Sequence, residues 1–152
     1  VQTCALPISA GFEHYEVSNY ALPGFRARHN ASYWHGTKYL GIGPAAHSFD
    51  GEERHWNASS VEKYIAGAPA GKEVLTRRDR FNEYVMTALR TVEGIDLEEA
   101  AARFGAKRLA RMQEEAAPFL RSGTLRIARG RMALPPEKFL ISDAVIGALF
   151  ET

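Results

Sequence analysis

The run YLGIGPAA, residues 39 to 46, constrains the fold of this chain more than any other stretch. Its apolar start, Tyr39 to Ile42, is typical of a buried strand that opens into the segment Gly43 to Ala46, where side chains have almost no bulk. Such a backbone lets a large ligand approach closely. The same glycines also suit a tight bend or the close packing of a strand on a helix, and a GxG pattern alone indicates this second arrangement more often.

The segment HNASYWHG, residues 29 to 36, concentrates an imidazole, an amide and two large aromatic rings. If it forms a helical turn, His29 and Tyr33 are neighbours on one face, and Asn30 and Trp34 share the adjoining face. Imidazole ligates iron, and flat aromatic rings pack well on a porphyrin or an adenine. The other interpretation is that the two aromatic rings anchor a core, while the histidine and asparagine only hydrogen-bond a loop.

The composition favours a small globular protein and gives no electrostatic reason to expect nucleic acid or an anionic membrane as a partner. The chain has 152 residues, 45% of them hydrophobic and 24% charged, and its formal net charge is +1. Its one cysteine, Cys4, argues against a disulfide scaffold and is expected to be an inert thiol in a frayed terminus. No apolar run is long enough for a transmembrane helix, so we expect a cytoplasmic protein.

Short elements are predicted in the first half of the chain, where turn residues separate runs of aromatic and β-branched residues. They are strands at Phe12 to Asn19, Ala46 to Phe49 and Arg54 to Asn57, a helix capped by the Ser59-x-x-Glu62 box through Ala66, and a linker at residues 68 to 71. Glu16 is either a solvated strand charge or, with Asn19, lies near a ligand.

Helical periodicity dominates the second half. The predicted elements are a helix capped by Thr76 with an apolar face through Val92, a helix from Asp96 to Phe104, a helix from Lys107 to Leu120, a hairpin across Arg129-Gly130, and a last helix with Pro136 in its first turn. Three helices followed by a hairpin is a winged-helix-like order, which raises nucleic-acid binding as an alternative function.

Basic residues on the third helix and the hairpin support that alternative: Lys107, Arg108, Arg111, Arg126, Arg129 and Arg131. Acidic residues oppose it. Residues 76 to 152 hold 13 Lys and Arg against 11 Asp and Glu, and Glu114 and Glu115 lie on the same third helix. DNA-binding domains usually show a clearer basic surface, so nucleic acid is an unlikely partner.

Four blocks in order carry a family resemblance: YEVSNYA from Tyr15, PG at Pro23, RHN with YW from Arg28 to Trp34, and YLGIGP with AHS from Tyr39 to Ser48. Together they resemble the C-terminal half of the oxygen-independent coproporphyrinogen III oxidase-like radical SAM proteins. The HNxxYW block resembles the haem-chaperone (HemW-like) branch more than the oxidases. The resemblance covers residues 9 to 152 and leaves 1 to 8 as a leader that is expected to be non-native.

The resemblance implies an α/β fold: the C-terminal end of a partial (β/α) radical SAM barrel at residues 9 to 57, a helix and linker at 58 to 75, and a winged-helix-like domain at 76 to 152. Family members bind a [4Fe–4S] cluster and S-adenosylmethionine through a CxxxCxxC loop in an N-terminal barrel half. This chain has one cysteine and no such loop. We therefore expect part of a longer protein, inactive alone, with the missing barrel half as a partner.

The resemblance also implies the site. His29 is the candidate axial ligand of a haem iron, with Asn30, Tyr33 and Trp34 shaping its pocket, and Gly41 and Gly43 let the backbone approach S-adenosylmethionine or a porphyrin. Arg26 and Arg28 can pair with ligand carboxylates or simply be solvated. The expected function is a haem chaperone that binds haem or porphyrin and serves haem-acceptor proteins; the alternative is an oxygen-independent coproporphyrinogen III oxidase.

Overall fold

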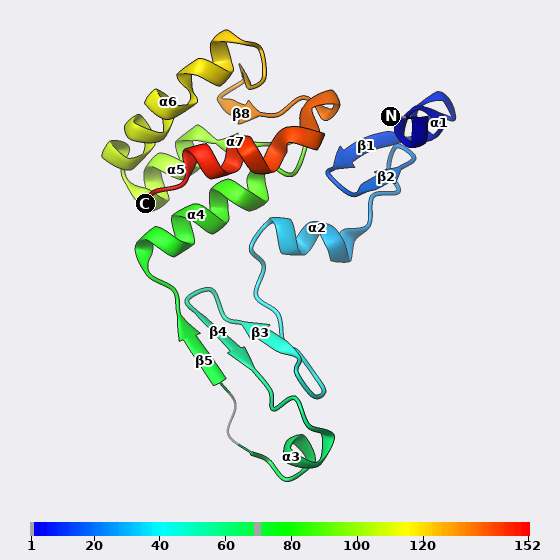
Figure 1. The fold of residues 1–152 in the computed structure, drawn as a ribbon, viewed down its shortest axis with the longest axis vertical. Helices are drawn as coiled ribbons and strands as arrows, with labels where there is room; N and C mark the ends of the chain where they lie inside the picture. Colours follow the sequence, from blue (N-terminus) through cyan, green and yellow to red (C-terminus); the bar gives the residue numbers. More distant parts are fainter. Residues whose placement is uncertain (1, 69–70) are drawn as a thin grey trace. The chain divides into compact units, whose positions relative to one another are not determined.

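A computed structural model describes residues 2–68 and 71–152 (Figure 1). The chain forms two compact units: the helical unit, residues up to 35 together with 81–152, and the sheet unit, residues 36–80. In chain order the helical unit contains α1 (Gln2–Ser9), β1 (Glu13–Glu16), β2 (Asn19–Ala21), α2 (Arg28–Trp34), most of α4 (Arg77–Ala88), β6 (Ile95–Asp96), α5 (Leu97–Phe104), α6 (Ala106–Arg121), β7 (Arg126–Ala128), β8 (Arg131–Ala133), the 3₁₀ helix η1 (Pro136–Ile141) and α7 (Ser142–Leu149).

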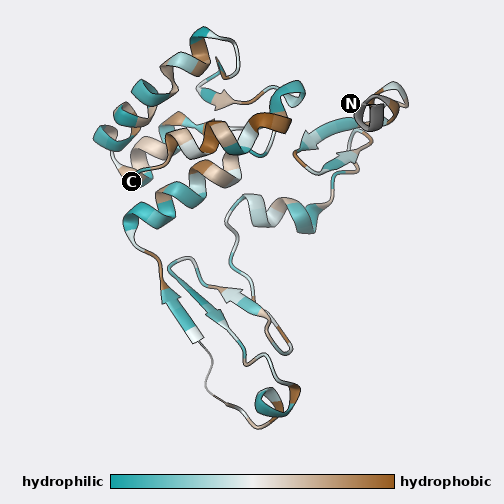
Figure 2. Ribbon diagram, in the orientation of Figure 1, coloured by the Kyte–Doolittle hydropathy of each residue, from teal (hydrophilic) through white to brown (hydrophobic). Residues whose placement is uncertain are grey.

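The predicted α/β class and the winged-helix-like order are confirmed in the helical unit. Its three-stranded antiparallel sheet has the order β6-β8-β7, with Met132 of β8 paired to both Ile95 and Ile127. Residues of α4 to α7, of η1 and of the connecting segments complete one apolar core, and Figure 2 shows apolar residues along α7. The most deeply buried side chains of this core include Phe81, Val85, Leu89, Met112, Ala116, Leu125, Leu134, Val145 and Leu149.

Local sequence signals act as expected at the start of α5 and at the hairpin turn of this unit. The Asp96 side chain caps α5 by accepting hydrogen bonds from the backbone N–H groups of Glu98 (3.1 Å) and Glu99 (3.0 Å). The turn between β7 and β8 places both Arg129 (φ +51°) and Gly130 (φ +74°) in the left-handed region that a two-residue hairpin requires. Strand β6 was not predicted, because two residues carry no periodicity.

The predicted strand at Phe12 to Asn19 is wrong in one respect, because the segment turns at residues 17 and 18 and returns as β2. The turn is closed by Glu16, whose fully buried carboxylate accepts hydrogen bonds from the backbone N–H of Ser18 (3.2 Å) and from the Asn19 side-chain amide. A solvated role for Glu16 is therefore excluded. The turn docks on the chain after α4 through a bridge between Glu16 and Thr91.

Near its start the chain forms a helix, and the expected fraying of this terminus stays a prediction. Helix α1 covers Gln2–Ser9 and its last turn leads directly into the hairpin, where the Phe12 N–H donates to the Pro7 carbonyl at 3.0 Å. Cys4 lies in α1. The non-native origin of residues 1 to 8 stays a prediction.

The sheet unit contains β3 (His47–Phe49), β4 (Glu53–Trp56), α3 (Val61–Ile65) and β5 (Gly71–Val74), with the antiparallel order β3-β4-β5. The hairpin across Asp50-Gly51 is confirmed, because the Asp50 side chain accepts from the N–H groups of Glu52 and Glu53. Helix α3 is capped by Ser60, one residue after the predicted Ser59. Part of the predicted linker is strand β5, and residues 69 and 70 lie outside the described part.

The buried strand predicted at Tyr39 to Ile42 is wrong. Only Tyr39 pairs with a strand residue, Phe49, while the side chains of Leu40 and Ile42 are 79% and 82% exposed. An apolar run becomes a buried strand only when another layer covers it, and none of the described residues of the sheet unit forms such a layer.

The compact units group residues differently from the predicted domains, since residues 9–35 belong with 81–152. The predicted boundaries at residues 57 and 75 stay a prediction. All strand pairs among the described residues are antiparallel. None of the helices described is both long and apolar enough to span a membrane.

Gly94 provides a test of the packing in the helical unit. It has φ +66°, and a Cβ there would collide with the Met132 carbonyl and with Ala133. We expect Gly94→Ala to lower the free energy of unfolding by about 2–4 kcal/mol. The control, Gly147→Ala in α7, meets open space and should raise it by about 0.5–1 kcal/mol. Urea unfolding followed by circular dichroism measures both, and equal effects would contradict the packing at Gly94.

Tyr84 provides a test by pH. Its hydroxyl donates to the Asp96 carbonyl and accepts from the Asp96 N–H, both at 3.2 Å. Burial first, and then the negative charge of Glu99, raise the pKa of Tyr84 from 10.0 to about 12. Because the folded state disfavours the phenolate, this contribution to stability is complete below pH 10 and is lost as the pH rises through about 12.

We therefore expect Tyr84→Phe to cost about 1 kcal/mol of unfolding free energy at pH 8, where two hydrogen bonds are lost. The difference between wild type and variant should shrink from pH 10 upward. When tyrosine ionisation is followed by phenolate absorbance against pH, the phase at the highest pH should also be absent in the variant. A difference that stays constant up to pH 12 would exclude this role of the Tyr84 hydroxyl.

Candidate functional site

Four of the predicted site residues lie on α2, which confirms that the HNxxYW block is helical. The rings of His29 and Tyr33 meet edge to face, with centroids 5.1 Å apart and planes at 80°. This i, i+4 contact fixes the orientation of the imidazole. The His29 ring makes no hydrogen bond with any described residue, so both its nitrogens are available to a ligand.

No side chain of α2 is buried, so its aromatic residues do not anchor a core in the helical unit. His29 and Asn30 are exposed, Tyr33 is 45% exposed and Trp34 is half-buried. Phe25, just before the helix, is 79% exposed. Accessible imidazole and aromatic side chains close together in the sequence suit contact with the face of a large planar ligand.

The two arginines before His29 differ sharply in their surroundings. Arg26 forms ion pairs with Glu93 (2.6 Å) and Glu13 (3.2 Å), and its guanidinium lies over the Tyr15 ring. Burial alone would lower the pKa of Arg26, but the hydrogen bonds and charges of Glu93 and Glu13 outweigh it and raise that pKa. Arg28 is exposed and forms no ion pair with any described residue.

The other two predicted site residues, Gly41 and Gly43, lie in a loop of the sheet unit that side chains hold firmly. The Gly41 N–H donates to the Ser48 hydroxyl at 3.0 Å, and the Gly43 N–H donates to the Tyr64 hydroxyl at 3.2 Å. The Asn57 amide donates to both glycine carbonyls, at 3.3 and 2.9 Å. Four polar groups of the loop backbone are therefore already satisfied within this unit.

The two glycines serve different purposes. A Cβ at Gly41 would collide with the backbone of His47, so this glycine is required for close packing inside the sheet unit. Gly43 has φ +109° and nothing within 4 Å of where its Cβ would be. Of these two glycines, only Gly43 therefore has space beside its backbone for a ligand. Ligand binding at either glycine stays a prediction.

His47 belongs to an aromatic layer on the same sheet. It is exposed and lies 5.8 Å from the Trp56 ring, its partner across β3 and β4. The Trp56 ring in turn covers Gly71, where any Cβ would collide with it. His55 lies near Glu53 (3.4 Å) and Asp50 (4.0 Å) on the hairpin surface.

Sequence reasoning missed the residues that build the loop around the glycines. Ser48 was quoted only as part of a motif, and Asn57 and Tyr64 were not singled out. The sequence indicates these contacts only weakly. A polar residue at the end of a strand, or a tyrosine in a short helix, can be assigned to a loop only when the position of that loop is known.

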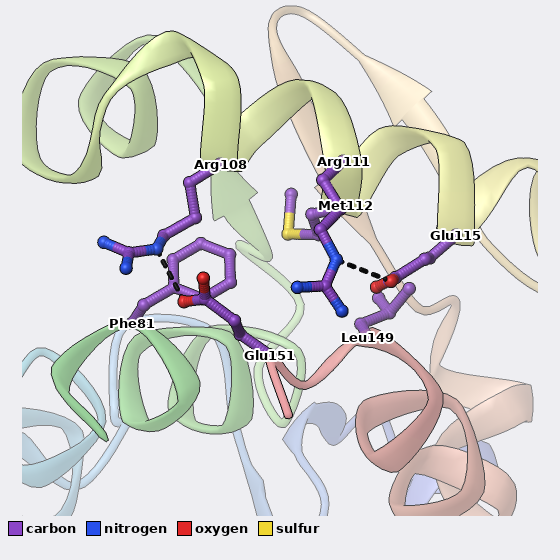
Figure 3. A pocket seen from close by; sticks show the side chains of 7 residues that line it. All are labelled: Phe81, Arg108, Arg111, Met112, Glu115, Leu149 and Glu151. Carbon is purple, nitrogen blue, oxygen red and sulfur yellow. Dashed lines mark hydrogen bonds and ion pairs between the residues drawn. The ribbon is translucent and has the colours of Figure 1, made fainter. Parts of the chain in front are cut away.

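Two other features of the described residues bear on the site. No group of three or more His, Cys, Asp or Glu side chains gathers there as a metal site. A small hollow of the helical unit, lined by Phe81, Arg108, Arg111, Met112, Glu115, Leu149 and Glu151, contains none of the predicted site residues (Figure 3). Its two arginines are paired, Arg108 with Glu151 at 2.6 Å and Arg111 with Glu115 at 3.0 Å, so its charges cancel.

Comparison with known proteins relates the chain to one family. Residues 75–141 match the HemN C-terminal domain. The chain is 37% identical to the heme chaperone HemW of Mycobacterium tuberculosis over 93% of its own length. The chain is similar to the C-terminal part of HemN/HemW-like proteins, and its residues 75–141 carry the HemN C-terminal domain. A second relative, the heme chaperone HemW of Lactococcus lactis, is 37% identical over 62% of the chain.

The HemN/HemW-like fold extends over nearly the whole chain. The solved structure of coproporphyrinogen III oxidase (HemN) from Escherichia coli, described as a radical SAM enzyme, matches 98% of the chain with a TM-score of 0.72 and 17% identity. The chain spans 39% of that structure, 36% of the mycobacterial relative and 26% of the lactococcal one.

Asn57 offers a test of the glycine loop. Asn57→Ala removes the donor to the carbonyls of Gly41 and Gly43, so we expect the amides of residues 39–46 to exchange hydrogen faster, by about tenfold. Hydrogen exchange by mass spectrometry measures this.

The isosteric variant Asn57→Asp keeps the shape and lacks the donor, so it should behave like Asn57→Ala. Peptides of the helical unit serve as the internal control and should not change. Unaltered exchange of residues 39–46 in both variants would contradict the role of Asn57.

Proposed function

We propose that this chain provides the haem-binding part of a radical SAM haem chaperone, with His29 as the axial ligand of the haem iron. Asn30, Tyr33 and Trp34 would shape the surface against which the macrocycle lies. The observation that carries the proposal is the exposed His29 ring, held edge to face by Tyr33 and bound to no other described side chain. The relatives named heme chaperone HemW support it.

The donor chemistry of α2 fits haem. A porphyrin supplies four nitrogens to its iron, so the protein needs to contribute one axial imidazole and apolar or aromatic contacts. His29 supplies the first, and Tyr33, Trp34 and Phe25 supply the second. No cluster of protein ligands is needed for this kind of iron site.

The chain does not fit a [4Fe–4S] cluster, since it contains a single cysteine. In the intact protein, the cluster and S-adenosylmethionine would be held by a radical SAM barrel half that is a partner of this chain, with Gly43 as the part of the glycine loop that is open to a ligand. The exposed Leu40 and Ile42 beside that loop suit contact with such a partner. We further propose that haem-acceptor proteins are partners of the intact protein and that it is located in the cytoplasm.

Coproporphyrinogen III oxidase activity is the alternative. It has the support of a shared fold with HemN, but at 17% identity, whereas the relatives at 37% identity are named heme chaperones. Nucleic-acid binding is disfavoured by electrostatics. Four of the six basic residues that suggested it are engaged in ion pairs: Arg108, Arg111, Arg126 and Arg131.

Haem titration tests the proposal. We expect wild type to bind ferric haem with a shifted Soret band, and His29→Ala to lose that shift, because the axial nitrogen is gone. His35→Ala is the matched control, since His35 is also exposed and directly follows the same helix; it should bind as wild type does. Identical spectra for wild type and His29→Ala would sink the proposal.

A further inference from the structure

We propose that Arg28 binds a propionate of the haem and thereby makes the site selective for a tetrapyrrole with free carboxylates. This inference rests on the proposed function of His29. It concerns a different part of the ligand, the carboxylate edge of the macrocycle and not the iron.

The two arginines that precede His29 are not equivalent partners for a ligand. Arg26 already has two carboxylate partners, Glu93 and Glu13, and the aromatic face of Tyr15. A third carboxylate would meet a guanidinium whose charge is more than compensated. Arg26 therefore links β1 to the chain after α4, and we assign the propionate contact to Arg28 and not to Arg26.

Arg28 has the opposite surroundings. Its side chain is exposed and has no ion pair with any described residue. Helix α2, with the sequence RHNASYW, carries no acidic residue that could compete for the guanidinium. Arg28 is thus the cation nearest in sequence to His29 that an incoming carboxylate can reach.

The position of Arg28 suits the edge of a macrocycle bound by His29. Successive residues of a helix point about 100° apart, so the Arg28 side chain leaves the helix beside the imidazole and not over it. Tyr33 lies against the His29 ring one turn later, on the C-terminal side. The long side chain and planar guanidinium of Arg28 can hold a carboxylate at that edge by two parallel hydrogen bonds.

The test compares ferric haem with its dimethyl ester, which has the same iron and ring but no carboxylates. Each is titrated into wild type, Arg28→Gln and a control, Arg121→Gln, which removes an exposed arginine near the end of α6. We expect Arg28→Gln to bind haem about three- to tenfold more weakly than wild type does, and the ester equally well. Arg121→Gln should leave both affinities unchanged.

The outcomes separate the two proposals. If wild type binds neither ligand with a shifted Soret band, the function proposed for His29 fails. If wild type binds haem and Arg28→Gln binds it as tightly, the role of Arg28 is overturned while that of His29 stands. A loss for haem and ester alike would show that Arg28 acts on the fold of α2, and would overturn the propionate contact as well.

Discussion

A short stretch of backbone pairing joins the β1–β2 hairpin to the rest of the helical unit. The Val17 N–H donates to the Arg90 carbonyl at 3.0 Å, and the Val92 N–H donates to the Tyr15 carbonyl at 3.1 Å. These bonds join segments about 75 residues apart in the chain, so they close a long loop at a substantial entropic cost. Burial of apolar side chains at the same place, with Tyr15 buried and Val17 packed against the core, offsets that cost.

The parts of the fold that local sequence decides were predictable. Asp96 caps α5, and Arg129-Gly130 turns between β7 and β8, because each depends on residues within a few positions. The apolar face predicted for α4 is also correct for its buried residues, Phe81, Val85 and Ala88, since helical spacing alone defines that face. The HNxxYW block became a helix with the expected His29–Tyr33 contact for the same reason.

The errors concern elements whose structure depends on distant partners. Tyr39 to Ile42 has the composition of a buried strand, but burial requires a second layer that the sequence of the run does not describe. Glu16 is charged, yet the hairpin encloses it, because Ser18 and Asn19 satisfy its oxygens. Likewise, the sequence around the two arginines does not reveal that, among the described residues, Arg26 is paired and Arg28 is not, because the partner Glu93 is distant in the sequence.

Helix α2 has seven residues and buries none of them. A helix this short gains little from its own hydrogen bonds and, without a packed face, is marginally stable in isolation. Whatever binds its surface must therefore also stabilise the helix, and the measured affinity equals the intrinsic affinity reduced by the fraction of chains in which α2 is formed. Any contact that favours helical residues 28 to 34, even one remote from the ligand, would consequently act as a positive regulator of binding.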